Sequence, residues 1–178
     1  MKGVVFNVMQ EVVEQHLGEA VWDDAVERAG VEGVYTSLGN YPDTDLGALV
    51  GALAELADLS RSDVLVFAGR HGFSQFVSRH PDVVAEFLDW RDVVHHLDDI
   101  IHPEVGKIYP DIDAPSFEVI ADDPELIMVQ YRSRRQLCAL AEGLFLGLGD
   151  WFRQPLAVEH LTCTRHGDAA CTLTVGTA

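Results

Sequence analysis

The spacing of apolar residues changes near Pro110, and this change restricts the chain to folds in which helices precede strands. Before Pro110, apolar side chains recur at the helical period, as Val4, Val8 and Val12 do in one stripe near the start. Gly18 is placed to end this first helix. Further helices are expected at residues 19–29, at residues 46–56, after a capping box at Ser60 and Asp63, at Pro81, and along a stretch that reaches His102.

After Pro110 the chain carries short runs rich in β-branched and aromatic residues, which are typical of strands. Turn-forming residues separate the first two runs and the last two runs, so each pair predicts a hairpin. Strands are expected at residues 116–121, 126–131, 156–162 and 171–175, and a helix at residues 137–152. The predicted fold class is therefore α+β, with a mainly helical N-terminal portion followed by a β-β-α-β-β portion that forms an antiparallel sheet.

The composition fits one domain over residues 1–178, with a helical portion at 1–110 and an α/β portion at 111–178. Hydrophobic residues make up 48% of the chain, which suits either a large apolar pocket or a rich ordinary core. The net charge of -17 argues against nucleic acid or an anionic membrane as a partner. No apolar run approaches the roughly 20 residues of a membrane span, and the start lacks a signal-peptide pattern. Three cysteines without an export signal predict a reducing, cytoplasmic location.

His102 is a candidate ligand because a neutral imidazole is the usual protein ligand of haem iron. In a chain with eight histidines, any single one is more often an ordinary surface or core residue. Pro103 disfavours helical backbone at the residue before it, so the helix is expected to end or bend at His102. Such a bend would free the imidazole from the helix surface and direct it toward a cofactor.

The row Tyr131-x-Ser133-x-Arg135 offers hydroxyl and guanidinium donors that suit carboxylates. Strand alternation would place these three side chains on one face and turn Arg132 and Arg134 toward the other. A dianion clamp is one interpretation of this row. The alternative is an exposed strand edge within a basic patch.

In combination with their neighbours, these residues resemble the haem-nitric oxide/oxygen binding (H-NOX) family, which includes the sensor domain of soluble guanylate cyclase. The resemblance covers nearly the whole chain and rests on segments in order: Met1-Lys2-Gly3-Val4-Val5-Phe6-Asn7, Tyr35-Thr36-Ser37-Leu38-Gly39, Tyr41-Pro42-Asp43, Ile101-His102-Pro103-Glu104-Val105, Tyr109-Pro110-Asp111, Pro115-Ser116-Phe117, Tyr131-x-Ser133-x-Arg135, Leu137-Cys138 and Ala141-Glu142-Gly143-Leu144. It implies haem b between the two portions, with His102 on the iron and Pro115 against the haem plane. It assigns the propionates to Tyr131, Ser133 and Arg135.

The resemblance also bears on which gas is bound. Oxygen-binding members carry a distal tyrosine where this chain has Leu140, so the sequence predicts binding of NO and CO and discrimination against oxygen. Other residues align with distal positions: Val5, Met9, Phe67, Ser74 and Leu144. All but Ser74 are apolar, and Ser74 is a possible donor to bound oxygen. The alternative is that Leu140 and Leu144 are ordinary core residues, since pocket lining and core filling look the same in sequence.

A second set of candidate ligands consists of the three cysteines and one histidine: Cys138, His160, Cys163 and Cys171. One hairpin can supply three of these ligands and the start of the preceding helix the fourth, which suits a closed tetrahedral zinc site. The alternative is three reduced thiols packed as small hydrophobes. The set also resembles a zinc site found in a subset of bacterial H-NOX proteins. Oxidation of such thiolates would release the metal, which adds redox sensing as a second possible input.

The resemblance implies a haem-based NO sensor rather than an enzyme. NO is expected to weaken or break the bond between iron and His102 and so release the helix that carries His102. The chain is expected to lack an output domain of its own, and bacterial relatives regulate a separate histidine kinase or cyclic-di-GMP enzyme, so a protein partner in trans is expected. Two other classes stay open. One is a haem enzyme such as a peroxidase, which needs distal acid–base residues. The other is a haem-free, zinc-stabilised ligand-binding adaptor built on residues 115–178.

Overall fold

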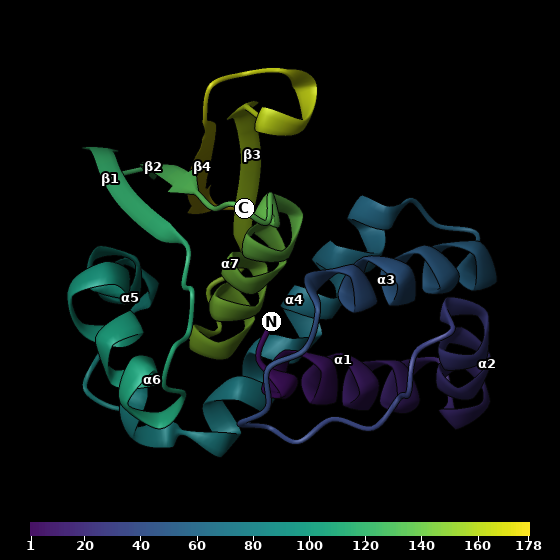
Figure 1. Cartoon of the computed structure of the whole chain (residues 1–178). Helices are drawn as coiled ribbons and strands as arrows, with labels where there is room; N and C mark the ends of the chain where they lie inside the picture. Colours follow the sequence, from purple (N-terminus) through teal and green to yellow (C-terminus); the bar gives the residue numbers. More distant parts are fainter.

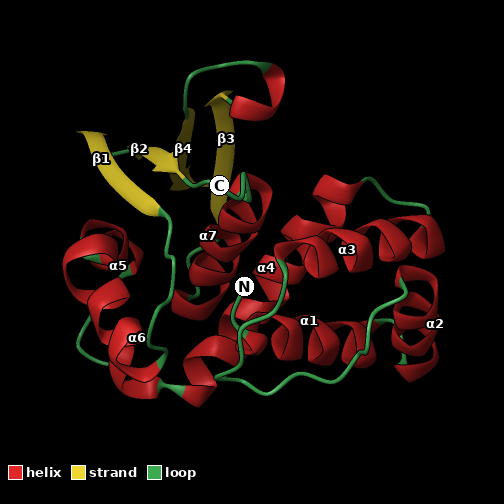
Figure 2. Cartoon of the chain, in the orientation of Figure 1, coloured by secondary structure: helices red, strands yellow, loops and turns green.

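A computed structural model describes the whole chain, residues 1–178, as a group of helices beside a small sheet (Figures 1 and 2). The helices are α1 (Gly3–His16), α2 (Glu19–Ala29), α3 (Asp43–Ala57), α4 (Arg61–Arg79), α5 (Trp90–His95), α6 (His102–Ile108) and α7 (Cys138–Phe152). The strands are β1 (Ser116–Asp122), β2 (Leu126–Arg132), β3 (Leu156–Thr162) and β4 (Cys171–Thr177). Helix α7 runs through the middle of the molecule, between the N-terminal helices and the sheet (Figure 1). None of the helices combines the length and the apolar character needed to cross a membrane.

The sheet is antiparallel with strand order β1-β2-β4-β3, so the two predicted hairpins join through β2 and β4. In β2, Ile127, Val129 and Tyr131 are buried while their neighbours are more exposed. This alternation is expected where one face of a strand packs on a core. The structure therefore confirms the prediction of an α+β chain whose second portion has the order β-β-α-β-β.

The N-terminal core is formed by helices α1 to α4. More of α1 is buried than the apolar stripe predicted. Phe6, Met9 and Val13 of α1 pack into the core with residues of α2, α3 and α4. Val4, Val8 and Val12 form a separate cluster with Tyr109, which follows α6. The predicted apolar stripe on α1 is therefore buried, and Phe6 extends the buried surface beyond it. This helix is buried on two faces because other helices cover both.

The second core lies between the sheet, α7 and the segment around α5. It combines Ile127 and Leu173 of the sheet with Phe145 of α7 and with Trp90 and Ile101 from the helical portion. The first core in turn contains Ala139 of α7. Both cores therefore draw residues from both sides of position 110, so the two predicted portions share their packing.

Helices α4 and α7 approach each other closely where glycines face backbone. A Cβ added at Gly143 would lie 2.2 Å from the carbonyl oxygen of Val66, and one at Gly69 would lie 2.5 Å from that of Leu140. A Cβ added at Gly147 would lie 2.4 Å from the carbonyl oxygen of Arg70. Real Cβ atoms do not reach such distances, so these glycines set the separation of the two helices. Since α7 also carries the sheet, this contact fixes the sheet relative to the N-terminal helices.

We expect Gly143→Ala to destabilise the protein by about 1–3 kcal/mol, because the added methyl group must push two backbones apart. Gly106→Ala is the matched control, since a Cβ in α6 would meet only Ile112, at 3.9 Å. That variant should gain up to about 1 kcal/mol from helix propensity. Urea unfolding of both variants measures the difference. Equal stability of the two variants would contradict the close α4–α7 contact.

The predicted long helix reaching His102 is instead divided into three pieces. Helix α5 is followed by a π-helical turn, Leu97–Ile101, and then by α6. His102 has helical dihedral angles, φ -63° and ψ -40°, and the helix continues to Ile108. The helix that was predicted to end or bend at His102 therefore does not end there. Proline removes a donor and crowds the carbonyl four residues earlier, and the wider π turn before Pro103 accommodates it without ending the helix.

Candidate functional site

His102 is the first residue of α6 and is held by a carboxylate one turn earlier. Its Nδ1 lies 3.0 Å from Oδ1 of Asp98, and its ring lies beside that of Phe117, with 5.8 Å between centroids. The other carboxylate oxygen of Asp98 accepts a hydrogen bond from the backbone N–H of Phe117 at 2.8 Å. Asp98 therefore joins the His102 segment to the beginning of β1.

This arrangement leaves the Nε2 atom of His102 as the ring nitrogen without a partner in the chain. Burial lowers the pKa of His102 below its usual value, and the neighbouring Asp98 offsets only part of that effect. The imidazole is therefore neutral at pH 7, which is the form that binds metal. A histidine that donates from one nitrogen to a carboxylate and offers the other is the common arrangement in metal sites. The surroundings of His102 thus fit an iron ligand.

Strand alternation predicted that Tyr131, Ser133 and Arg135 share one face of a strand, and this prediction was wrong. Strand β2 ends at Arg132, and the two later residues belong to the turn before α7. Tyr131 is buried, and Ser133 accepts a hydrogen bond from the backbone N–H of Arg135 at 3.2 Å. The chain turns here because a Ser hydroxyl satisfies a backbone donor two residues later. Ser133 and Arg135 thus lie in a turn that follows the strand carrying Tyr131.

Arg135 is largely enclosed and already has carboxylate partners. Its side chain is 17% exposed and lies 2.9 Å from Asp43 and 2.8 Å from Asp113. The N-terminal ammonium of Met1 also binds Asp43, and it is the main reason why the pKa of Asp43 lies below its usual value, with Arg135 adding to the effect. Arg135 is therefore oriented from both sides. Arg134, whose side chain is 84% exposed, also binds Asp113 at 2.7 Å.

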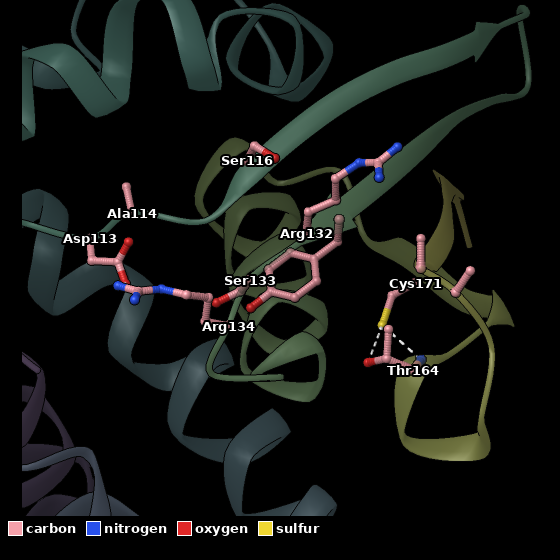
Figure 3. Close-up of a pocket in the computed structure, with 11 residues that line it drawn as sticks. Asp113, Ala114, Ser116, Arg132, Ser133, Arg134, Thr164 and Cys171 are labelled. Carbon is pink, nitrogen blue, oxygen red and sulfur yellow. Dashed lines mark hydrogen bonds and ion pairs between the residues drawn. The ribbon is translucent and has the colours of Figure 1, made fainter.

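A pocket of about 420 Å³ lies beside this turn (Figure 3). Tyr131 and Ser133 line it together with residues that precede β1 and residues of the β3–β4 connection: Asp113, Ala114, Ser116, Arg132, Arg134, Thr164, Ala169, Ala170 and Cys171. In Figure 3 the side chain of Arg134 reaches toward Asp113, whereas that of Arg132 points the opposite way. Hydroxyl groups and the charged side chains of Asp113, Arg132 and Arg134 thus surround this space, and Arg135 is not among the lining residues. This composition fits the binding of carboxylate groups.

The predicted distal residues are spread over two clusters of side chains. Met9 is buried in the N-terminal core, and the half-buried Leu140 packs against it. Val5 and Phe67 pack on the cluster around Tyr109. Leu144, on α7, and Pro115, before β1, are half-buried. All of these side chains are apolar, so they offer no hydrogen-bond donor to a bound ligand.

Ser74 differs from the other predicted distal residues. It is exposed, and its hydroxyl donates to the carbonyl oxygen of His71 in the same helix at 3.2 Å. A serine that bonds back to its own helix has its proton engaged there. Ser74 is therefore not available as a donor in this conformation.

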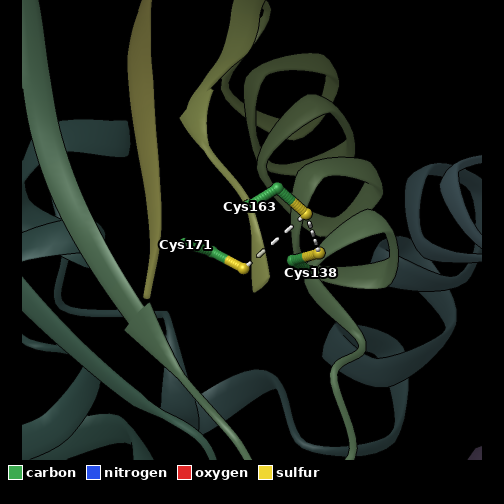
Figure 4. A group of neighbouring side chains, drawn as sticks. All are labelled: Cys138, Cys163 and Cys171. Atoms are coloured by element: carbon green, nitrogen blue, oxygen red, sulfur yellow. Dashed lines mark hydrogen bonds between the residues drawn. The ribbon is translucent and has the colours of Figure 1, made fainter. Parts of the chain in front are cut away.

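The three cysteines form a second, buried centre. Their sulfur atoms lie within 4.8 Å of one another, with 3.6 Å between Cys138 and Cys163 and 3.9 Å between Cys163 and Cys171 (Figure 4). Burial alone would raise the pKa of Cys163, but hydrogen bonding to Arg165 outweighs it and lowers the pKa overall. Burial raises the pKa of Cys138. One thiol is thus favoured as thiolate at this centre, the form in which cysteine binds metal.

His160, the expected fourth ligand, lies beside this group but not within it. Its Nε2 is 2.9 Å from Glu142 of α7, which is the main cause of its raised pKa, and Cys163 adds to the same effect. Its Nδ1 is buried and has no hydrogen-bond partner. A buried nitrogen without a partner is costly unless something else binds it. Carboxylate, imidazole and thiols are therefore arranged as in metal sites whose histidine is oriented by an acid.

The residues that sequence reasoning missed are acidic groups that orient the predicted ligands. Asp98 lies four residues before His102, a spacing that places both on one helix face and was visible in the sequence. Glu142 approaches His160 across 18 positions, and Asp113 approaches Arg135 across 22. No local pattern indicates the last two pairs, because each joins different elements. These carboxylates decide the orientation of His102, His160 and Arg135.

Comparison with known proteins agrees with the fold and with this geometry. The family model described as Haem-NO-binding matches residues 2–160. An H-NOX protein from S. oneidensis in the Fe(II)NO ligation state is 32% identical, with a TM-score of 0.93 over 100% of this chain and 99% of that chain. An unliganded Fe(II) H-NOX protein from K. algicida is 26% identical, with a TM-score of 0.89 over 100% of this chain and 97% of that chain.

A third relative is the H-NOX protein of Shewanella woodyi, solved with IWP-051 in the Fe(II)CO ligation state. It is 28% identical, with a TM-score of 0.82 over 100% of this chain and 95% of that chain. The similarity thus extends over the full length of this chain and nearly the full length of each relative. The chain belongs to the haem-NO-binding, or H-NOX, family.

Proposed function

We propose that this protein is a haem-based sensor that binds NO at ferrous haem and regulates a separate signalling protein. The observation that carries the proposal is the arrangement of His102, whose Nδ1 is bound by Asp98 and whose Nε2 has no partner. Support comes from the S. oneidensis relative in its Fe(II)NO state, which is similar over the whole chain. Ferrous haem, when bound, supplies the position at which a diatomic gas binds.

Each residue of the site has a distinct task in this proposal. His102 would hold the iron through Nε2, with burial keeping the ring neutral and Asp98 keeping it oriented. Tyr131, Ser133 and Arg135 hold the propionates, which would join Asp43 and Asp113 in binding the Arg135 guanidinium or replace one of them. Pro115 would pack against the haem.

Asp98 also provides a route from His102 to the sheet. One oxygen binds the His102 ring and the other binds the backbone N–H of Phe117 in β1. A shift of the His102 segment therefore pulls on the edge strand of the sheet. The π-helical turn before His102 is a suitable place for this movement, because its hydrogen-bond geometry differs from that of the helices on either side.

A sensor acts by favouring one of two conformations that a partner distinguishes. We propose that this partner is a separate protein, a histidine kinase or a cyclic-di-GMP enzyme. In this account the chain carries no catalytic residues of its own. The apolar character of Met9, Leu140 and Leu144 supports a binding role, since a haem peroxidase needs acid–base groups near the bound ligand.

The same apolar residues lead to a prediction about gas selection. Ferrous protein is expected to bind NO and CO and to form no stable oxygen complex in air. Bound oxygen gains partial negative charge and needs a donor, whereas Leu140 has none and the hydroxyl of Ser74 is engaged by His71. Leu140→Tyr should raise the oxygen affinity, and Leu140→Phe, of similar size without the hydroxyl, should not. Oxygen titrations followed by absorption measure both, and a long-lived oxygen complex of the unsubstituted protein would contradict the prediction.

We further propose that Cys138, His160, Cys163 and Cys171 bind zinc. The three sulfur atoms lie close enough to share one ion, and the unpartnered Nδ1 of His160 is the missing fourth donor. Glu142 would act as the acid that orients His160. Oxidation of the thiols would release the ion, so this centre would add a redox input to the gas sensor.

A further inference from the structure

A second pocket, of about 410 Å³, lies between α3, the start of α4 and the segment that leads into α7. Twelve residues line it: Met1, Asp43, Leu46, Gly47, Val50, Arg61, Leu65, Arg134, Arg135, Gln136, Leu137 and Arg165. Four of the twelve are arginines, although the whole chain has only 12 lysines and arginines against 29 acidic residues. Asp43 is the one acidic residue among them. The pocket therefore concentrates positive charge in a chain whose net charge is -17.

Two of the four arginines lack a carboxylate partner. Arg134 and Arg135 bind acidic side chains, as described above. Arg61 instead donates to the carbonyl oxygen of Gly47, and Arg165 donates to the hydroxyl of Ser62 at 2.5 Å and to the sulfur of Cys163. A guanidinium group has five N–H donors, so both keep donors free for a further anion.

Helix α3 is shaped to hold Arg61 at the pocket wall. Gly47 and Gly51 lie one turn apart on the helix, and the Arg61 guanidinium lies across them. A Cβ at Gly51 would lie only 2.5 Å from Nη1 of Arg61, and one at Gly47 would lie 3.8 Å from its Nη2. The missing side chains thus provide a slot for the guanidinium. A donor fixed in this way loses little conformational freedom when an anion binds.

The remaining walls are apolar. Leu46, Val50 and Leu65 are buried side chains of α3 and α4, and Leu137 precedes α7. A bare anion would leave these surfaces in contact with water. A ligand that carries both an anionic group and an organic body would cover them, and the volume falls in the usual range of roughly 300–1,000 Å³ for small-molecule sites.

We propose that this pocket binds a small organic phosphate of about nucleotide size. Arginine forks match phosphate oxygens better than other cations do, and Arg61 and Arg165 supply them here. The organic body lies against the wall of Leu46, Val50 and Leu65. This pocket adjoins the proposed haem and zinc sites, because Arg134 and Arg135 also lie beside the first pocket and Arg165 contacts Cys163.

Calorimetric titration of the full-length, haem-containing protein tests the proposal with AMP, inorganic phosphate and adenosine as probes. AMP should bind at least about tenfold more tightly than phosphate, and adenosine should give no measurable binding. The reason is that the charged phosphate and the organic body both contribute to the affinity. Arg61→Gln should weaken AMP binding by about tenfold or more through loss of the charged fork, and Arg61→Lys should recover only part of it. Arg165→Gln should also weaken AMP binding, provided that its metal content is unchanged.

Arg28→Gln is the matched control, because Arg28 is an exposed arginine of α2 that does not line the pocket. It should bind AMP as the unsubstituted protein does. The haem spectrum should be the same in all four variants, which separates this test from that of the gas sensor. Absence of AMP binding to the unsubstituted protein, equal affinity for AMP and phosphate, or undiminished binding in Arg61→Gln would each overturn the proposal.

Discussion

Replacing His102 with glycine is expected to remove the protein ligand of the iron, so that the purified variant loses most of its haem or holds it only when free imidazole is added. The reason is that the unpartnered Nε2 of this ring is the donor proposed for the iron, while Asp98 holds the other nitrogen. Imidazole can occupy the space left by the ring and supply the same donor. Absorption spectra with and without imidazole measure both effects.

Rescue by imidazole separates loss of the ligand from loss of the fold. Glycine in a helix costs about 1 kcal/mol relative to alanine, which added imidazole would not restore. His95→Ala is the control, because His95 lies on the preceding helix and binds Asp122 on the surface. Its spectrum should be unchanged. An unaltered ferrous spectrum of His102→Gly without imidazole would show that His102 does not bind the iron.

Cys171→Ala is expected to abolish zinc binding and to destabilise the sheet. Reduced, unsubstituted protein should contain about one zinc ion per chain. Structural zinc contributes on the order of 10 kcal/mol of binding free energy, much of it coupled to folding. Loss of one ligand should therefore lower the free energy of unfolding by about 4 kcal/mol or more. Metal analysis and urea unfolding measure the two effects.

A chelator distinguishes the metal from simple packing of the cysteine side chain. It should lower the stability of the unsubstituted protein nearly to that of Cys171→Ala and leave the variant unchanged. Peroxide should release zinc from the unsubstituted protein as the thiols oxidise. If freshly reduced protein lacks zinc and is fully stable, the better account is three buried thiols packed as small hydrophobes.

The zinc and propionate centres lie closer together than the sequence indicated. Tyr131 is the cross-strand partner of Cys171, and both line the pocket beside the turn at Ser133. Cys138 begins the helix that follows that turn. The zinc variants should therefore also alter the surroundings of Tyr131. Sequence spacing could not show this contact, because it depends on the pairing of β2 with β4.

Elements defined by local patterns were predicted well. The helix at residues 19–29 agrees with α2, and Ser60 and Asp63 form the predicted capping box. The strand at residues 156–162 agrees with β3. In each case the residues that determine the structure lie within a few positions of one another, so periodicity and capping were sufficient.

Predictions failed where distant contacts or helix variants decide the outcome. The π turn before His102 has no distinctive apolar spacing, so that stretch looked like one long helix. The partners of Arg135 come from Asp43, 92 positions away, and from Asp113. The prediction that His102 and Tyr131 serve one haem rests on the family resemblance alone, since apolar periodicity carries no information about which distant residues meet.

The central claim is most directly tested by the absorption spectrum of the purified ferrous protein before and after addition of NO. We expect a Soret band in the reduced protein and a shift of that band at about one equivalent of NO per chain. Protein that purifies without a Soret band and does not acquire one when haem is added would contradict the proposed sensor and leave a haem-free adaptor as the better account.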